Sequence, residues 1–289
     1  VYLLILLIAA FVSVAAMSRY TYGQNSNYVM GIDPQNSSAI YSVLSGFQFG
    51  LVMLITPALT AGAISGERER QTLNLMLITK MSPFKIAVGK LLSSLSVTLL
   101  MIIATMPVFA VVFFYGGVNI LDLLGITAYT ILSSAAVGSI CIFLSSVFKR
   151  TVSATVSSYI IVLGLCLGTL VLSLLAFAAL NFALNINGNS TIAAFLQNMD
   201  AKERSNIFIL LYICFFSLNP FVGFLAVIDK QLGTADIDGM FNMVSNGSYG
   251  MDEKNVWVYN VIFSILVVAV MLYFTSKVLQ PVKASKVRK

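Results

Sequence analysis

Seven charged side chains gather in one short stretch, GERERQTLNLMLITKMSPFKIAVGK, which runs from Gly66 to Lys90. Acidic and basic residues alternate at its start, and long, almost uncharged stretches flank it on both sides. Charged groups are costly to place in hydrocarbon, so this stretch must lie in water. We expect Glu67 and Glu69 to meet basic groups, either on Lys85 and Lys90 or on a partner protein. An ordinary solvated loop is the alternative interpretation of the same pattern.

The sequence contains no recognisable catalytic or metal-binding motif. Histidine is absent, which excludes histidine-based metal sites, general bases and Ser-His-Asp triads within the chain. The three cysteines, Cys141, Cys166 and Cys214, lie in apolar segments and are typical of small buried hydrophobic residues. No carboxylate lies deep in an apolar segment, because Asp122 is at the edge of one. We therefore predict no catalytic residue and no metal site, and a proton relay is disfavoured.

The composition indicates an all-α, polytopic membrane protein, because 58% of the 289 residues are hydrophobic and only 10% are charged. We expect a short segment to precede Val1, which begins inside an apolar run. The whole chain, residues 1–289, is predicted to form one transmembrane domain. Its six predicted spans cover residues 1–18, 41–65, 86–115, 120–148, 153–184 and 256–276.

A seventh apolar segment, residues 207–228, contains Asn219-Pro220 in its middle. The residue before a proline disfavours the helical conformation, and each remaining half is only about half a membrane long. This pattern favours an extracellular re-entrant helical hairpin that is buried against protein.

The distribution of basic residues supports this topology. With a re-entrant segment and a cytoplasmic amino terminus, 12 of the 17 basic residues fall on the cytoplasmic side, including those of the carboxyl-terminal KASKVRK. A spanning seventh segment would place that tail outside. The net charge of +6 is therefore interpreted as a topological signal rather than as a nucleic-acid surface.

Residues 67–81 are predicted to form an amphipathic helix at the cytoplasmic membrane surface. In a helix, one face would carry the apolar side chains of Leu73, Met76, Leu77 and Met81. Ser82 is a suitable cap for the following helix, and Pro83 suits its first position. The third span is therefore expected to begin near Pro83 and to extend beyond the hydrocarbon core.

The run GAISGERERQTLNLMLITKMSPFKIAVGKLL resembles the signature of ABC-2 type transporter permeases. The matching features are the Glu67 and Glu69 turn, the helix that starts at Thr72, the Ser82-Pro83 turn and Gly89-Lys90. The late LNPFVGFLAVI resembles the outer re-entrant segment of the family, so the likeness covers nearly the whole chain. One departure is Gln71, where the family often has glycine.

The resemblance implies a coupling helix that a separate cytoplasmic ABC ATPase moves when it binds ATP. The chain has no G-x-x-x-x-G-K-[ST] phosphate loop, so ATP and magnesium would be bound by that partner and no cofactor by this chain. A second permease chain, identical or related, would complete a dimeric exporter in the cell membrane, with the carboxyl terminus in the cytoplasm. The implied ATPase-coupling residues are Glu67, Arg68, Glu69, Arg70, Thr72, Leu73, Met76, Leu77, Lys80, Lys149 and Arg150.

Two further sets of residues are candidates for transport and assembly. Polar residues at membrane depth are sparse, and the candidate substrate pathway comprises Gln48, Thr56, Thr60, Asn181, Asn219 and Pro220. This apolar, hydroxyl-containing lining favours a hydrophobic, amphipathic or peptide-like substrate. The Gly164/Gly168 spacing permits close helix packing, either within the chain or with a second permease. The alternatives are a secondary transporter, an intramembrane enzyme, or a membrane partner of an ATPase that transports nothing.

Overall fold

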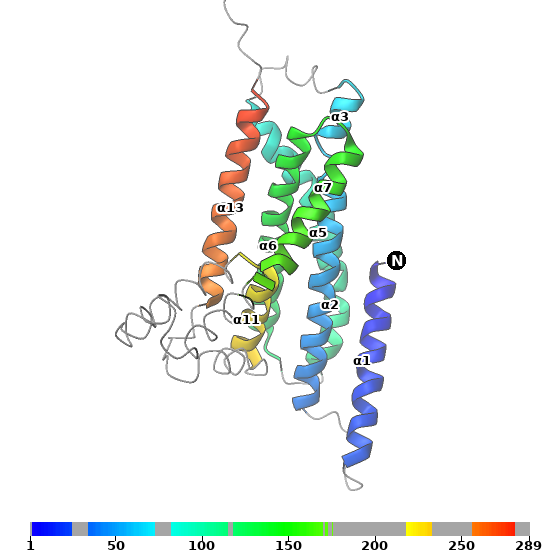
Figure 1. The fold of residues 1–289 in the computed structure, drawn as a ribbon. Helices are drawn as coiled ribbons and strands as arrows, with labels where there is room; N and C mark the ends of the chain where they lie inside the picture. Colours follow the sequence, from blue (N-terminus) through cyan, green and yellow to red (C-terminus); the bar gives the residue numbers. More distant parts are fainter. Residues whose placement is uncertain are drawn as a thin grey trace, which may run out of the picture. The chain divides into compact units, whose positions relative to one another are not determined.

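The computed structural model describes residues 2–24, 34–72, 82–114, 118–169, 171–172, 175, 218–232 and 256–280. Every regular element in these ranges is helical (Figure 1). The helices are α1 (Tyr2–Gln24), α2 (Pro34–Thr60), α3 (Ser65–Glu69), α5 (Pro83–Phe114), α6 (Ile120–Val147), α7 (Thr151–Leu163), the π-helix η1 (Gly164–Gly168), α11 (Pro220–Leu232) and α13 (Val256–Val278). The predicted all-α fold is therefore confirmed for the described residues.

Five segments of the described chain are long and apolar enough to cross a membrane. They are Ser37–Glu69, Pro83–Ala110, Ile120–Val147, Thr151–Gly168 and Trp257–Val278. The first predicted span lies in α1, where the described residues include the shorter apolar helix Tyr2–Ser13. The chain is thus a multi-pass membrane protein, and the sixth span stays a prediction.

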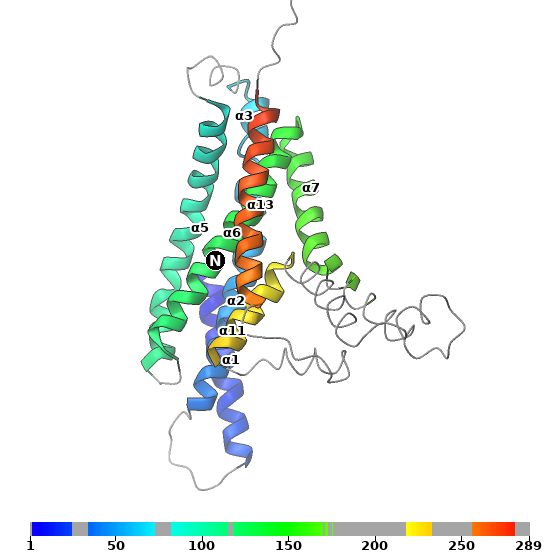
Figure 2. The ribbon, with the colours of Figure 1, turned by 90° about the vertical axis from the view of Figure 1, so that its left-hand side faces the viewer.

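The chain divides into two compact units. The first unit comprises Val1–Val162 and Ser264–Lys289, and the second comprises Leu163–Phe263. Among the five candidate spans, Ile120–Val147 is the most buried. Figure 2 shows α5 and α7 on opposite sides of α6.

Helices α2 and α6 run parallel in a constant register along much of their length. Tyr41 donates a hydrogen bond of 3.3 Å to the carbonyl of Asp122, which is 81 positions further along the chain. Phe49 stacks on Tyr129 at 6.0 Å between ring centroids. At the far end, Ser145 binds the backbone of Ser65, 80 positions earlier. This register places the segment after α2 directly beside the end of α6.

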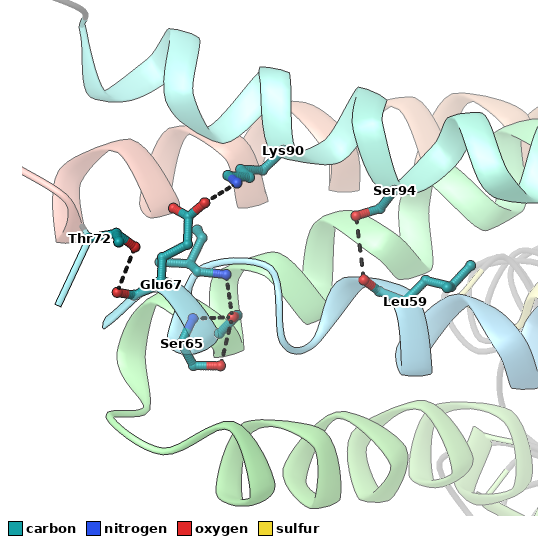
Figure 3. Close-up of polar contacts among 8 residues, drawn as sticks. Leu59, Ser65, Glu67, Thr72, Lys90 and Ser94 are labelled. Atoms are coloured by element: carbon teal, nitrogen blue, oxygen red, sulfur yellow. Dashed lines mark hydrogen bonds and ion pairs between the residues drawn. The ribbon is translucent and has the colours of Figure 1, made fainter. Parts of the chain in front are cut away.

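Helix α5 returns antiparallel to α2, and its contacts join both ends of that helix. The Tyr41 and Phe109 rings pack edge to face at 5.9 Å. Near the opposite end, Ser94 donates a hydrogen bond of 3.5 Å to the carbonyl of Leu59 (Figure 3). An apolar cluster lies at this same end and joins α5, α6 and α13 to the residue before α3. It comprises Ile64, Ala87, Leu91, Leu95, Ile142, Leu272 and Leu279.

Helix α5 begins as the sequence predicts. Its first residue is Pro83, and the Ser82 hydroxyl accepts a hydrogen bond of 3.4 Å from the backbone N–H of Lys85. The Ser82 hydroxyl gives a hydrogen-bond acceptor to one of the free N–H groups at the helix start. Pro83 has no N–H group, so it needs no acceptor there. The helix has 32 residues and is therefore about 48 Å long at 1.5 Å per residue, which exceeds a hydrocarbon core of about 30 Å.

Candidate functional site: the charged turn

We call residues 65–72 the charged turn. It follows α2 in the first unit, and three consecutive charged side chains within it each contact a different helix. Glu67 forms an ion pair with Lys90 of α5 (Figure 3). Both side chains are partly buried, and Oε2 of Glu67 has no hydrogen-bond partner among the described residues. A pair that is only partly exposed is less screened by water and salt than a surface pair.

Arg68 binds the end of α6. Its guanidinium donates hydrogen bonds of 2.9 Å to the carbonyl of Ser146 and 3.2 Å to the carbonyl of Phe148. Helix α6 ends at Val147, so these carbonyls belong to its last, unpaired turn. A cation at this position also interacts favourably with the negative end of the helix dipole. Arg68 therefore caps the carboxyl terminus of α6.

Glu69 binds the start of α7. Its carboxylate accepts hydrogen bonds from the backbone N–H of Thr151 at 2.8 Å and from the Thr151 hydroxyl at 2.9 Å. Thr151 is the first residue of α7, where N–H groups are free and a negative charge is favourable. The carboxylate therefore caps the amino terminus of α7 from a segment 82 positions earlier.

Ser145 fixes the backbone at the start of the charged turn. Its hydroxyl oxygen accepts hydrogen bonds from the N–H of Ile64 at 3.0 Å and from the N–H of Ser65 at 2.9 Å. The same hydroxyl donates to the hydroxyl of Ser65 at 3.2 Å (Figure 3). All three residues are buried. These bonds replace the helical hydrogen bonds that α2 gives up when it ends at Thr60.

The predicted continuous helix over residues 67–81 is wrong in its described part, because the helix stops at Glu69. Gln71 has a φ of 58°, the left-handed conformation that commonly ends helices. Its N–H bonds to the carbonyl of Arg68 at 3.1 Å, and the N–H of Thr72 bonds to the carbonyl of Glu67 at 3.0 Å. This is a Schellman motif, and glycine suits its left-handed position best.

The structure brings together only some of the predicted coupling residues. Glu67, Arg68 and Glu69 each bind their own chain, and the Glu69 side chain is exposed. The side chains of Arg70, Thr72, Lys149 and Arg150 are exposed at the same end of the unit. Leu73, Met76, Leu77 and Lys80 lie outside the described residues.

The sequence analysis did not identify the residues to which the charged turn is hydrogen-bonded. Ser145 is one of many serines in α6, and the Phe148 carbonyl is a backbone group, so neither gives a signal of its own. Thr151 was recognisable, because a threonine after Lys149-Arg150 at the start of an apolar run is a typical helix start.

The predicted pathway residues in α2 are buried, and two of them serve packing. The hydroxyls of Thr56 and Thr60 donate to carbonyls of their own helix, each at 2.7 Å. A Cβ added at Gly138 of α6 would meet both threonine methyl groups, at 3.6 and 3.4 Å. Gln48 is 3% exposed, and its Nε2 has no hydrogen-bond partner among the described residues. Gln48 is therefore the α2 candidate whose polar group the packing does not account for.

In the second unit, Asn219 is the centre of a buried hydrogen-bond group that we call the Asn219 network. Its Nδ2 donates to the carbonyl of Cys166 at 2.8 Å and to the Thr169 hydroxyl at 2.9 Å. Its Oδ1 accepts from the N–H of Phe221 at 2.9 Å, and its backbone carbonyl accepts from Asn260 at 3.1 Å. The side chain of Asn219 is only 1% exposed.

The Asn219 network explains how two irregular backbone segments are tolerated. Cys166 lies in the π-helix η1, whose widened turn displaces carbonyls from the regular helical pattern. Asn219 lies just before Pro220, where α11 begins, as the sequence predicts for this dipeptide. The remainder of the predicted re-entrant hairpin and the pathway candidate Asn181 lie outside the described residues.

Gly164 and Gly168 begin and end η1, and both are exposed. A Cβ added at either glycine would meet no atom of the described residues within 4 Å. Within this part of the chain, neither glycine is therefore required for close packing.

Apolar helices, a charged turn at one end and an uncharged interior define a multi-pass membrane protein. A family model described as ABC-2 family transporter protein matches residues 1–279, so the chain belongs to this family of membrane transport components. The family is generally non-catalytic and works in the membrane with ABC ATPases. No curated protein matches the sequence.

Proposed function

We propose that this chain is the permease subunit of an ATP-driven exporter and that the charged turn transmits the motion of a separate ABC ATPase. The observation that carries this proposal is the divergence of three neighbouring side chains to three helices. Glu67 contacts α5, Arg68 contacts α6, and Glu69 contacts α7. A displacement of the turn would therefore act on several spans at once, rather than on α2 alone.

The proposed contact with the ATPase begins where these internal contacts end. Helix α3 ends at Glu69, and the residues that follow it, Arg70 to Thr72, are exposed. The sequence then continues with the apolar residues Leu73, Met76 and Leu77. We propose that these apolar side chains anchor the ATPase or the lower ends of the spans. Removing an apolar anchor from the centre of an interface can cost about 2 kcal/mol or more, which is roughly thirtyfold in affinity.

The test is to compare the wild type with Leu73→Asp and Leu77→Asp after expression with the ATPase. Co-purification, ATP hydrolysis and transport into inverted vesicles are measured on the same preparations. We expect both variants to lose the partner or to hydrolyse ATP without transport. Full assembly and full coupled transport in both variants would contradict the coupling role and favour the solvated-loop interpretation.

The proposed topology places the charged turn and the tail after Lys277 in the cytoplasm. Its support is that Leu279 packs with Ile64 and Ala87, so the basic tail leaves the first unit at the end where the charged turn lies. Single cysteines at Lys230 and Ser285, in a background without native cysteines, are expected to label from outside and inside, respectively. Labelling of both from one side would contradict this arrangement.

The proposed substrate is hydrophobic, amphipathic or peptide-like. No Asp or Glu occurs between Asp122 and Asp200, and the polar groups of α2 are amides and hydroxyls, which gives little support for a simple cation. Amphipathic compounds are expected to stimulate ATP hydrolysis by the purified complex, whereas sodium is not. Saturable sodium stimulation would contradict this part of the proposal.

The proposed complex is a dimer of permeases, identical or related, with two ATPase subunits. Its support is the exposed, unfilled surface at Gly164 and Gly168, which leaves room for a close helix partner. Replacement of Gly168 by leucine is expected to weaken the dimer measured by light scattering in detergent, whereas leucine in place of the equally open Gly89 is the matched control.

A further inference from the structure

One exposed face of α13 changes its chemistry along the helix. Four exposed side chains follow one another there at helical spacing, and they are Leu266, Val270, Tyr273 and Lys277. We call these residues the α13 stripe. The first two are apolar, the third is amphipathic and the last is charged. This order matches the passage from the hydrocarbon core of a bilayer through its interface to the lipid headgroups.

The charged end of the α13 stripe is held in place by an aromatic ring. Nζ of Lys277 lies 4.8 Å from the ring centroid of Tyr273, one helical turn earlier, in a cation–π contact. The Lys277 side chain is nevertheless exposed, and no carboxylate of the described residues forms an ion pair with it. Its positive charge therefore remains available to an anion at the level of the headgroups.

The residues that follow α13 add charge of the same sign. No Asp or Glu occurs between Glu253 and Lys289, whereas the segment after Lys277 contains Lys283, Lys286, Arg288 and Lys289. A cluster of about four or more Lys and Arg residues beside a transmembrane helix is typical of segments that bind anionic lipids. Leu279 is buried in one cluster with Ile64 and Ala87, which fixes the point where this segment leaves the first unit.

We infer that Tyr273, Lys277 and the basic residues of 283–289 form a binding site for the headgroup of an anionic phospholipid, whose acyl chains lie along Val270 and Leu266. An acidic protein surface is the other occupant with suitable charge. A partner in water would not account for the apolar part of the stripe, which continues along the same face of α13 into the hydrocarbon. The inference goes beyond the proposed function and requires no ATPase.

The experiment measures which lipid lies beside the α13 stripe. Trp257 is the only tryptophan in the sequence, so Leu266→Trp in a Trp257→Phe background reports on this stripe. The protein is placed in bilayers that mix phosphatidylcholine with phosphatidylglycerol, and one of the two lipids carries brominated acyl chains that quench tryptophan fluorescence. Quenching gives the association constant of phosphatidylglycerol relative to that of phosphatidylcholine. We expect a ratio of about five or more, the factor that one basic side chain near the membrane surface contributes.

Two charge variants and a second reporter position test whether the preference belongs to this site. The glutamine variant changes all five basic residues, as Lys277→Gln, Lys283→Gln, Lys286→Gln, Arg288→Gln and Lys289→Gln. It should lower the ratio to about one, whereas exchange of lysine and arginine at the same positions should retain the preference. Leu100→Trp on α5, which is also exposed, is the control reporter. Its ratio should not change between these variants.

Several results would overturn the inference. They are a ratio of about one at Leu266→Trp with all charges present, a ratio that stays high in the glutamine variant, and an equal fall at Leu100→Trp. A ratio of about one together with weaker binding of the purified ATPase by the glutamine variant would identify a protein partner instead. If the glutamine variant fails to insert, the charged protein decides the question, because a higher ratio at Leu266→Trp than at Leu100→Trp supports the site and equal ratios contradict it. Each of these results leaves the proposed function in place.

Discussion

The charged turn and the Asn219 network both stabilise interrupted helices, but with different side-chain chemistry. Each supplies hydrogen bonds to backbone groups at an interruption of helical structure. The charged turn uses Arg68 and Glu69 at the ends of α6 and α7, and the Glu69 side chain is exposed. The Asn219 network uses a neutral amide that is 1% exposed.

This difference in charge and exposure indicates which of the two regions is better suited to rearrangement. Charge-assisted contacts at an exposed end are screened, and water can replace each of them at a cost of about 1 kcal/mol or less. A buried amide has no such replacement, so breaking its bonds costs the full desolvation of the groups left behind. We therefore expect the charged turn to move during function and the Asn219 network to stay fixed.

The buried cysteines provide a reporter for each region. Cys141 is buried in α6 of the first unit, and Cys166 is buried in η1 of the second unit. In variants that keep only one of these cysteines, a thiol-reactive dye reports the temperature at which that thiol becomes exposed as its unit unfolds. The predictions below use these two backgrounds.

The largest expected effect is that of Asn219→Leu. The substitution removes three side-chain hydrogen bonds, to Cys166, Thr169 and Phe221, and leaves buried polar groups unpaired. The expected loss is about 2–3 kcal/mol of stability, seen as earlier exposure of Cys166 on heating. Thr169→Val removes one of these three bonds and should cost about 1 kcal/mol. Equal effects of the two variants would show that Asn219 is not the centre of the network.

The next largest effect is expected for Ser145→Ala in the first unit. The backbone N–H groups of Ile64 and Ser65 would lose their acceptor while remaining buried, which costs about 1–2 kcal/mol. Ser146→Ala is the matched control, because among the described residues the Ser146 hydroxyl bonds only to the carbonyl of Phe143 in its own helix. Thermal exposure of Cys141 should separate the two variants. Identical midpoints would contradict the role of Ser145 in fixing the turn.

A smaller effect separates two neighbouring arginines. Arg68→Met removes the cap of α6 and should cost about 1 kcal/mol, because the side chain is only partly buried. Arg70→Met changes an exposed side chain and should remain within about 0.5 kcal/mol of the wild type. The midpoint of Cys141 exposure measures both. A larger loss of stability for Arg70→Met than for Arg68→Met would contradict the conclusion that Arg68, and not Arg70, makes the internal contacts.

The smallest expected effect is a gain. Gln71→Gly relieves the left-handed backbone at the end of α3 and should stabilise the first unit by about 0.5–1 kcal/mol. Gln71→Val, which is β-branched, should destabilise it. Circular dichroism melts of the two variants in detergent give the sign. Destabilisation by glycine would mean that the Schellman motif does not form in solution.

Local chemistry could be predicted from the sequence where neighbouring residues determine the structure. Ser82-Pro83 predicted the start of α5, and Asn219-Pro220 predicted the interruption before α11, because capping and proline sterics act within a few residues. The stop at Gln71 was missed, although the glycine that the family often has there indicates a left-handed position.

Long-range contacts could not be predicted in the same way. The Glu67–Lys90 pair was one of the partners expected for that carboxylate, since only a few basic residues are near in sequence. The contact of Arg68 with the Phe148 carbonyl depends on the parallel register of α2 and α6, which no local pattern in either helix specifies. The apolar face of residues 73–81 stays a prediction.

The central claim is that the charged turn links the ATPase to several spans through its internal contacts. Its most direct test is the ratio of transport to ATP hydrolysis in proteoliposomes for Glu67→Lys, Lys90→Glu and the double charge swap. The account predicts that each single variant still assembles and hydrolyses ATP, but transports several-fold less per ATP, and that the swap restores most of the ratio. A wild-type ratio in both single variants would contradict the claim.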